Sequence, residues 1–112
     1  MERLPVSEFQ ILLSLVTAPR HGAAIRDDVA DRTEGGVVLG PGTLYTSIKR
    51  LRARGWIDEV EPEASPTAGT DVRRFYVLTP AGREAVREEA GRLEQDLAYA
   101  RRHGLVGQQP AT

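Results

Sequence analysis

Glycine and proline residues divide this chain into short segments, and this division limits the fold more than any other feature of the sequence. Proline lacks a backbone N–H and glycine readily adopts the left-handed conformation that caps a helix, so regular elements tend to end at these residues. Such breaks stand at Pro19, Gly35-Gly36, Gly40-Pro41-Gly42, Gly55, Thr79-Pro80 and Gly104. With 112 residues, we expect one small unit whose elements fit between these breaks.

Three of the segments carry apolar residues at helical spacing. They predict helices from Ser7 to the break at Pro19, over residues 23–33 and over residues 43–54. The residues expected to face inward are Phe9, Leu12, Leu13 and Val16 in the first helix, Ile25, Val29 and Ala30 in the second, and Leu44, Ile48 and Leu51 in the third. The first helix opens on a Ser-x-x-Gln capping box, in which the Ser7 hydroxyl would accept the N–H of Gln10.

Two short segments rich in β-forming residues follow the third helix, at residues 56–60 and 72–78. They predict an antiparallel hairpin. Gly55 stands between the helix and the hairpin, where a glycine commonly caps a helix. Residues 61–71 consist of Pro, Ala, Ser, Thr and Gly with acids, and we expect a loop there.

A long helix is expected next. Thr79 supplies a capping hydroxyl and Pro80 suits the first helical position, so the helix is predicted over residues 81–103. The order predicts a mainly α protein with a small β-hairpin, that is, a winged helix-turn-helix with three helices and a two-stranded wing, plus a long C-terminal dimerisation helix. The expected units are a winged-helix domain at 1–79, the dimerisation helix at 80–104 and a flexible tail at 105–112.

Composition excludes several kinds of protein. The chain has no cysteine, so disulfides and thiolate metal sites are ruled out. Its longest apolar run, residues 11–16, is far too short to cross a bilayer, and its first twenty residues carry acids that a secretory signal would not. We therefore expect a cytoplasmic protein with no membrane partner, no metal and no cofactor.

Catalysis is not expected either. His21, in a predicted turn, and His103, at a helix end, have no paired serine, cysteine or carboxylate at a recognisable spacing. A metal set can be drawn from His21 with Asp27, Asp28 and Asp31, but a solvated acidic start to the second helix accounts for the same residues. The chain is predicted not to be an enzyme.

The third predicted helix concentrates positive charge. Residues 39–57 hold four cations and no acid, although the whole chain has a net charge of −1. With its apolar stripe turned inward, this helix presents the following residues outward or at its flanks: Gly42, Thr46, Lys49, Arg50, Arg52, Ala53 and Arg54. Such a helix suits the major groove of DNA. The alternative is a basic face exposed only to water; the absence of acids, the preceding tight turn and the arginines of the hairpin favour the groove.

Four motifs follow one another along the chain: Gly42-Thr43-Leu44-Tyr45, Ile48-Lys49-Arg50-Leu51, Gly55-Trp56-Ile57, and Arg73-Arg74-Phe75-Tyr76-Val77-Leu78-Thr79-Pro80-Ala81-Gly82. In combination they resemble the PadR family of bacterial transcriptional regulators, over about residues 5–103. The resemblance implies a winged-helix domain that binds double-stranded DNA, a homodimer formed largely through the C-terminal helix, and, usually, repression through operator binding.

The resemblance and the outward face together give these candidates for DNA contact: Thr43, Tyr45, Thr46, Lys49, Arg50 and Arg52 on the third helix, and Arg73 and Arg74 on the wing. Tyr45 lies at the edge of the apolar face, so its ring is expected to pack while its hydroxyl reaches a phosphate. DNA phosphates would repel the loop acids Glu61, Glu63 and Asp71. If the loop lies near DNA, Arg73 and Arg74 would have to anchor the wing from its base.

Two further readings stay open at this point. Some members of the family bind small molecules at the dimer interface, so a small-molecule effector is one expectation that rests on the resemblance alone. A winged-helix protein-interaction module without DNA binding is the alternative function, because the wing and the whole chain are acidic.

The long helix carries a stripe typical of a two-stranded coiled coil. Val86, Ala90, Leu93, Leu97 and Ala100 recur at alternating spacings of four and three. The stripe is expected to form a homodimer, although packing on the chain's own core would explain it too. In such a dimer, the third helix of each subunit would contact DNA, and two of these helices about 34 Å apart would read a near-palindromic operator.

Overall fold

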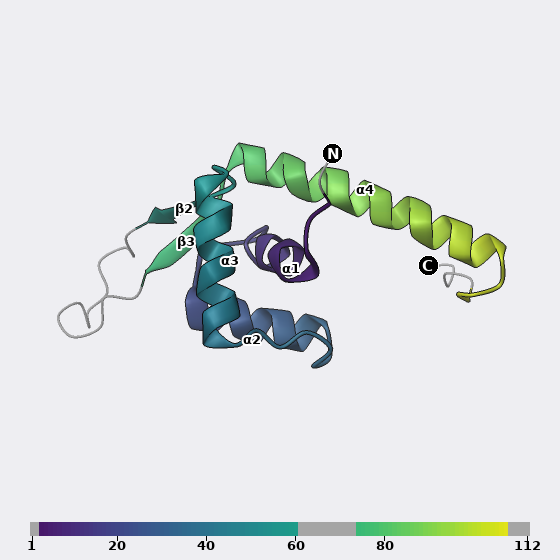
Figure 1. The fold of residues 1–112 in the computed structure, drawn as a ribbon, viewed down its shortest axis with the longest axis horizontal. Coiled ribbons are helices and arrows are strands. Elements are labelled where there is room, and N and C mark those ends of the chain that lie inside the picture. Colours follow the sequence, from purple (N-terminus) through teal and green to yellow (C-terminus); the bar gives the residue numbers. More distant parts are fainter. Residues whose placement is uncertain (1–2, 61–73, 108–112) are drawn as a thin grey trace.

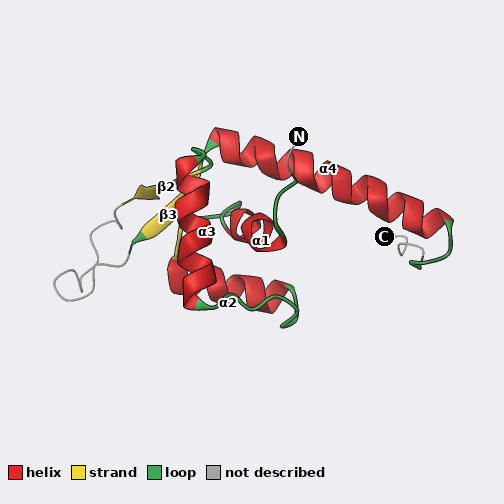
Figure 2. Ribbon diagram, in the orientation of Figure 1, coloured by secondary structure: helices red, strands yellow, loops and turns green. Residues whose placement is uncertain are grey.

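The computed structural model describes residues 3–60 and 74–107. Its elements are α1 (Val6–Ser14), β1 (Arg20–His21), α2 (Gly22–Arg32), α3 (Pro41–Ala53), β2 (Ile57–Val60), β3 (Phe75–Leu78) and α4 (Pro80–Arg102). Figures 1 and 2 show α1, α2 and α3 grouped together, with the small sheet beside α3 and α4 running away from the group. The predicted order of a winged helix-turn-helix with a long C-terminal helix is confirmed.

The sheet has three strands, where the sequence predicted two. β3 lies in the middle and pairs antiparallel with β2, Ile57 standing opposite Leu78, and with the two-residue β1 on its other side. The predicted turn at His21 and Gly22 is wrong, because His21 belongs to β1 and Gly22 opens α2. A strand of two residues cannot show an alternating pattern, so nothing local in the sequence marks it. The predicted loop at residues 61–71 lies outside the described residues.

One apolar core joins the three helices to the sheet and to the start of α4. Its buried members are Ile11, Leu12, Leu15, Ile25, Val29, Leu39, Leu44, Ile48, Leu51, Ile57, Tyr76 and Val86. The inward stripe predicted for α3 is confirmed, whereas in α1 the predicted Phe9 and Leu13 are only partly buried. Residues 11–16 are nearly all apolar, so spacing alone does not select which of them face the core.

The start of α1 differs from the prediction. The helix begins at Val6, with Pro5 in the N-cap position and no side-chain cap. The predicted capping box is therefore wrong, and Ser7 lies inside the first turn. Proline has a fixed φ that suits entry into a helix, so Pro5 starts the helix before Ser7 can cap it. The Ser7 hydroxyl therefore makes no capping hydrogen bond to the helix.

Thr79 fastens the start of α4 to the end of α3. Its hydroxyl accepts the N–H of Gly82 at 3.0 Å, as predicted for a cap, and donates to the carbonyl of Gly55 at 2.6 Å. Its own N–H donates to the carbonyl of Trp56 at 3.0 Å. The backbones lie so close that a Cβ on Gly82 would collide with the Trp56 carbonyl oxygen. We call Thr79, Gly82, Gly55 and Trp56 the Thr79 joint.

α4 is anchored through its first half. Val86 lies in the core, and the buried Glu89 accepts hydrogen bonds from Arg3 at 2.8 Å and from Arg92 at 3.0 Å. These donors, Arg3 above all, lower the pKa of the Glu89 carboxyl below its usual 4.5. The second half of α4 projects past the other helices (Figure 1), which makes the molecule about twice as long as it is wide, at 56 × 29 × 28 Å.

Gly82→Ala should destabilise the protein by more than the roughly 1–3 kcal/mol typical of overpacking, because the added Cβ meets backbone that cannot turn aside. Urea unfolding would measure the loss. Gly91→Ala, in the same helix, is the control: nothing lies within 4 Å of a Cβ at that position. It should raise stability by about 0.5–1 kcal/mol, as expected for removing a glycine from a helix interior. Equal effects of the two changes would contradict the close approach at the Thr79 joint.

Arg3→Gln should lower the melting temperature near neutral pH, and the difference from wild type should shrink in acid. A lowered carboxyl pKa means that the folded state binds the proton less tightly, so the stabilisation is complete above the usual pKa of 4.5 and is lost as the pH falls through the lower folded value. Thermal melts between pH 7 and pH 3 would test this. Arg87→Gln, which removes an exposed pair with Glu84, should change little at any pH.

Candidate nucleic-acid interface

The outward face of α3 is exposed and carries no acid. The exposed residues on it that were predicted to contact DNA are Thr43, Tyr45, Thr46, Lys49, Arg50 and Arg52. On the other side of the helix the apolar stripe is buried, so the core holds α3 in the rotation that its spacing predicted. Arg74, directly before β3, is exposed as well. Arg73 and the acids Glu61, Glu63 and Asp71 lie outside the described residues.

Acids from other elements lie beside three of these arginines. Nη1 of Arg50 is 4.0 Å from Oε2 of Glu8 in α1. Arg52 and Arg74 share the carboxylate of Glu59 in β2, at 3.8 and 3.3 Å. The two acids restrain the guanidinium groups at the border of the outward face, and they offset part of its positive charge.

Lys49 is held by none of these contacts. Within residues 3–60 and 74–107 no ion pair or hydrogen bond engages its ammonium group, and its side chain is exposed in the middle of the outward face. Its charge is therefore available to a ligand. Arg54, at the end of the helix, instead places its guanidinium 4.9 Å from the ring centroid of Trp56. Trp56 packs partly buried against the core.

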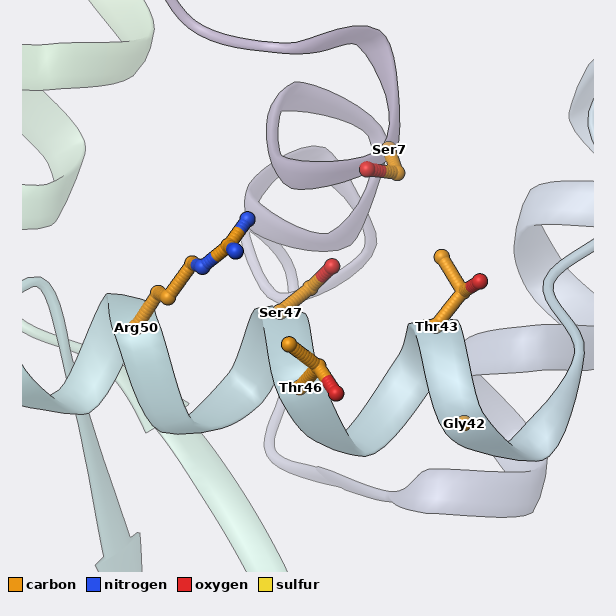
Figure 3. A pocket seen from close by; sticks show the side chains of 6 residues that line it. All are labelled: Ser7, Gly42, Thr43, Thr46, Ser47 and Arg50. Carbon is orange, nitrogen blue, oxygen red and sulfur yellow. The ribbon is translucent and has the colours of Figure 1, made fainter.

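A polar hollow of about 440 Å³ opens between α3 and the first turn of α1. Its lining residues are Ser7, Gly42, Thr43, Thr46, Ser47 and Arg50. In Figure 3 the side chains of Ser47 and Arg50 rise from α3 toward α1, and the Ser7 hydroxyl turns toward them. Hydroxyl groups and one guanidinium make this α1–α3 hollow a set of hydrogen-bond donors at the edge of the basic face.

Tyr45 packs across the start of α2. A Cβ on Gly22 would lie only 2.8 Å from the Tyr45 hydroxyl oxygen, so the absence of a side chain at Gly22 makes room for it. One edge of the ring therefore lies against Gly22, while Tyr45 as a whole is 54% exposed, and a contact between its hydroxyl and a phosphate stays a prediction. Tyr76 on β3, by contrast, is buried in the core. Its burial and the nearby Glu59 carboxylate raise the pKa of its hydroxyl above the usual 10.0, so the hydroxyl stays neutral.

The structure divides the stripe that was predicted for dimerisation. Val86 is buried in the chain's own core, which is what the alternative to a partner helix foresaw for this position. Farther along α4, Leu93 and Leu97 are 43% and 41% exposed; Ala90 is exposed too, and Ala100 is half-buried. The part of the stripe that is left for a partner therefore begins after Val86.

Sequence reasoning missed four residues of this region: Ser7, Glu8, Ser47 and Glu59. Ser47 follows Thr43 by four positions and precedes Arg50 by three, so helical spacing alone would have placed it beside them. The spacing Ser-x-x-Gln misdirected the assignment of Ser7. Glu8 and Glu59 reach the arginines from other elements, and no local pattern reveals such contacts.

The metal set drawn from His21 and three aspartates is not assembled. Among the residues that the structure describes, no group of three or more His, Asp or Glu side chains is placed to hold a metal ion. His21 instead caps α2, its Nδ1 accepting the N–H of Ala24 at 3.3 Å. No helix in the described part of the chain combines the length and the apolar character that crossing a membrane requires.

Similar proteins of known structure share this architecture. A PadR family transcription regulator from Clostridium difficile R20291 has a TM-score of 0.73 at 17% identity, over 88% of this chain and 98% of that one. Bacillus subtilis PadR, solved in complex with operator DNA, has a TM-score of 0.62 at 18% identity, over 96% of this chain and 50% of that one. At such identities the likeness establishes the winged-helix fold.

The sequence comparisons establish the family. Transcriptional regulator Rv3488 of Mycobacterium tuberculosis is 35% identical over 75 residues, which are 67% of this chain and 64% of that protein. The chain spans between 22% and 64% of the length of the curated relatives that it matches. Residues 11–88 match the transcriptional regulator PadR-like family. That family consists of regulators, in agreement with the prediction that the chain is not an enzyme. The chain therefore belongs to the PadR-like family of transcriptional regulators.

Proposed function

We propose that this protein is a homodimeric, sequence-specific DNA-binding repressor, which acts in the cytoplasm on a near-palindromic operator. In this proposal the outward face of α3 enters the major groove, with Thr46 and Lys49 toward the bases. Thr43, Arg50 and Arg52 lie at its flanks, where the phosphates are. Repression follows because a dimer bound in the groove excludes other proteins from the same site.

The observation that carries the proposal is the exposed, acid-free face of α3. The apolar stripe of this helix is fixed in a core, and its opposite face holds small residues and a lysine that no described residue engages. Such a helix has the shape and the charge for a groove. The winged-helix fold is shared with Bacillus subtilis PadR, whose structure contains operator DNA. Arg74, directly before β3, and its sequence neighbour Arg73 would add contacts to the phosphate backbone.

The homodimer rests on the second half of α4. Leu93 and Leu97 are large apolar residues on a helix that has left its own core, and Ala90 and Ala100 continue the same stripe. A second copy of α4 would cover this stripe. Dimerisation also matters for affinity, because two α3 helices bound to one duplex bind far more tightly than either alone.

The double variant Lys49→Ala/Arg50→Ala should lose operator affinity by roughly a hundredfold or more, since each residue that reaches a base or a phosphate is worth about 1–3 kcal/mol. We would select the operator from a pool of random duplexes with the wild-type protein, then measure gel shifts across a salt series. The slope of log affinity against log salt should flatten by about one unit for each phosphate that the variant no longer neutralises.

Arg83→Ala/Arg87→Ala is the matched control for that experiment, because it removes two exposed cations from the first half of α4. It should leave both the affinity and the salt slope close to wild type. Circular dichroism would verify that both double variants are folded. Undiminished DNA binding by Lys49→Ala/Arg50→Ala would refute the assignment of α3 to the groove.

A protein-interaction module without DNA binding is the second candidate, and the ion pairs favour it. Glu8 and Glu59 stand beside three of the arginines that DNA would need, so the face is less positive than its sequence suggests. The same selection separates the two functions. A DNA-binding protein enriches related duplexes from the pool, whereas an interaction module enriches none.

Leu93→Asp/Leu97→Asp should halve the mass measured by light scattering, because four carboxylates in the paired stripes would repel one another. Operator affinity should fall with it by more than tenfold, since the dimer's bivalent binding disappears. Gln95→Asp adds a carboxylate at an exposed position between them in sequence, away from the stripe, and should leave the mass unchanged. A wild-type protein that is monomeric at micromolar concentration would rule out this dimer.

A small-molecule effector rests on the family resemblance alone. A thermal-shift screen against drug-like and phenolic compounds tests for one, and saturable stabilisation by any compound would support sensing.

A further inference from the structure

We infer that the α1–α3 hollow is a binding site for one phosphate of the DNA backbone, with Ser7 and Ser47 as contact residues that the basic face alone does not identify. The inference rests on the proposed DNA binding and deepens it. It gives α1, which no motif connects with DNA, a direct part in positioning the protein on the duplex.

The hollow has the donors that an anion requires. Arg50 and the Ser7 hydroxyl lie at its rim, and Thr43 and Thr46 also line it, although the Thr46 hydroxyl points away from α1 in Figure 3. The first turn of α1 has no side-chain cap, so no side-chain acceptor occupies its leading N–H groups. Helix N-termini with free N–H groups attract anions through both hydrogen bonds and the helix dipole.

Ser47 is the second and independent observation. Ser47 as a residue is only 4% exposed, yet nothing among the described residues hydrogen-bonds to its hydroxyl, which points into the hollow in Figure 3. The hydroxyl oxygen is open to the hollow and not enclosed by protein, so a ligand can reach it. A phosphate oxygen would satisfy it.

Among the described residues, Glu8 is the acid that faces this site. Its Oε2 lies 4.0 Å from Arg50, and its Oε1 is buried without a hydrogen-bond partner in the same part of the chain. One long contact leaves most of the five N–H donors of Arg50 unused. The guanidinium side chain is 66% exposed, so it can bind a phosphate on its outer side while Glu8 restrains it from the inner side.

The position of the hollow argues for a DNA phosphate over a free anion. It lies along the flank of α3, between the exposed face and α1, and the flanks of a helix in the major groove run beside the sugar-phosphate strands. Serine, threonine and arginine side chains together with helix N-termini are the groups that commonly hold such phosphates. The contact would fix register and would carry no sequence preference.

The test combines a double variant with ethylation interference. Ser7→Ala/Ser47→Ala should weaken binding to the selected operator about three- to tenfold, equally for related and unrelated duplexes, with an unchanged salt slope because no charge is removed. On ethylated operator DNA, one phosphate in each half-site should interfere with wild-type binding and should interfere less with binding of the double variant, in which Arg50 is the main remaining contact. Thr17→Ala, which removes an exposed hydroxyl outside the hollow, is the matched control.

The outcomes are distinguishable. If wild-type protein retains no duplex from the pool, the proposed function and this inference both fail. If it binds DNA but the double variant shows the same affinity and the same interference pattern, the inference fails and the function stands. Saturable thermal stabilisation by inorganic phosphate at constant ionic strength, abolished in the double variant while DNA binding is unaffected, would overturn the DNA assignment in favour of a free anion.

Discussion

Burial of the apolar stripe of α3 is the constraint on which the rest of the structure depends. Leu44, Ile48 and Leu51 are almost fully removed from water. Burying three such side chains favours this rotation of the helix by several kcal/mol over one that exposes them. Since the stripe fixes the rotation, it also fixes which side chains face outward. The core thereby determines which side chains form the exposed surface, although its own members are buried.

The cations on that surface differ in their surroundings, because acids from other elements lie beside some of them, which the sequence alone does not indicate. Arg50, Arg52 and Arg74 each stand within 4.0 Å of an acid, whereas Lys49 stands alone among the described residues. In the proposed DNA complex, the neighbouring acids would weaken attraction for DNA of any sequence, which would favour discrimination over bulk affinity.

Local patterns predicted the helices, the cap at Thr79 and the outward residues of α3, because each depends on neighbours within one or two turns. The remaining features depend on contacts between distant residues. β1 forms only because β3 lies beside it, and Glu59 meets Arg74 across the sheet. Val86 fits the heptad pattern of a seam, yet it reaches the core because the Thr79 joint sets the direction of α4. Ser7 matched a capping motif that Pro5 had already displaced.

The same joint has a mechanical consequence. Only Thr79 separates α4 from β3, and the first turn of α4 lies against the Trp56 carbonyl, in the turn between α3 and β2, without room for even a methyl group. With so close a backbone contact, α3 and α4 are expected to move as one rigid unit. In a symmetric dimer formed through the far ends of α4, the fixed angle at the Thr79 joint would set the distance between the two α3 helices. Such a dimer would tolerate little variation in the spacing of operator half-sites.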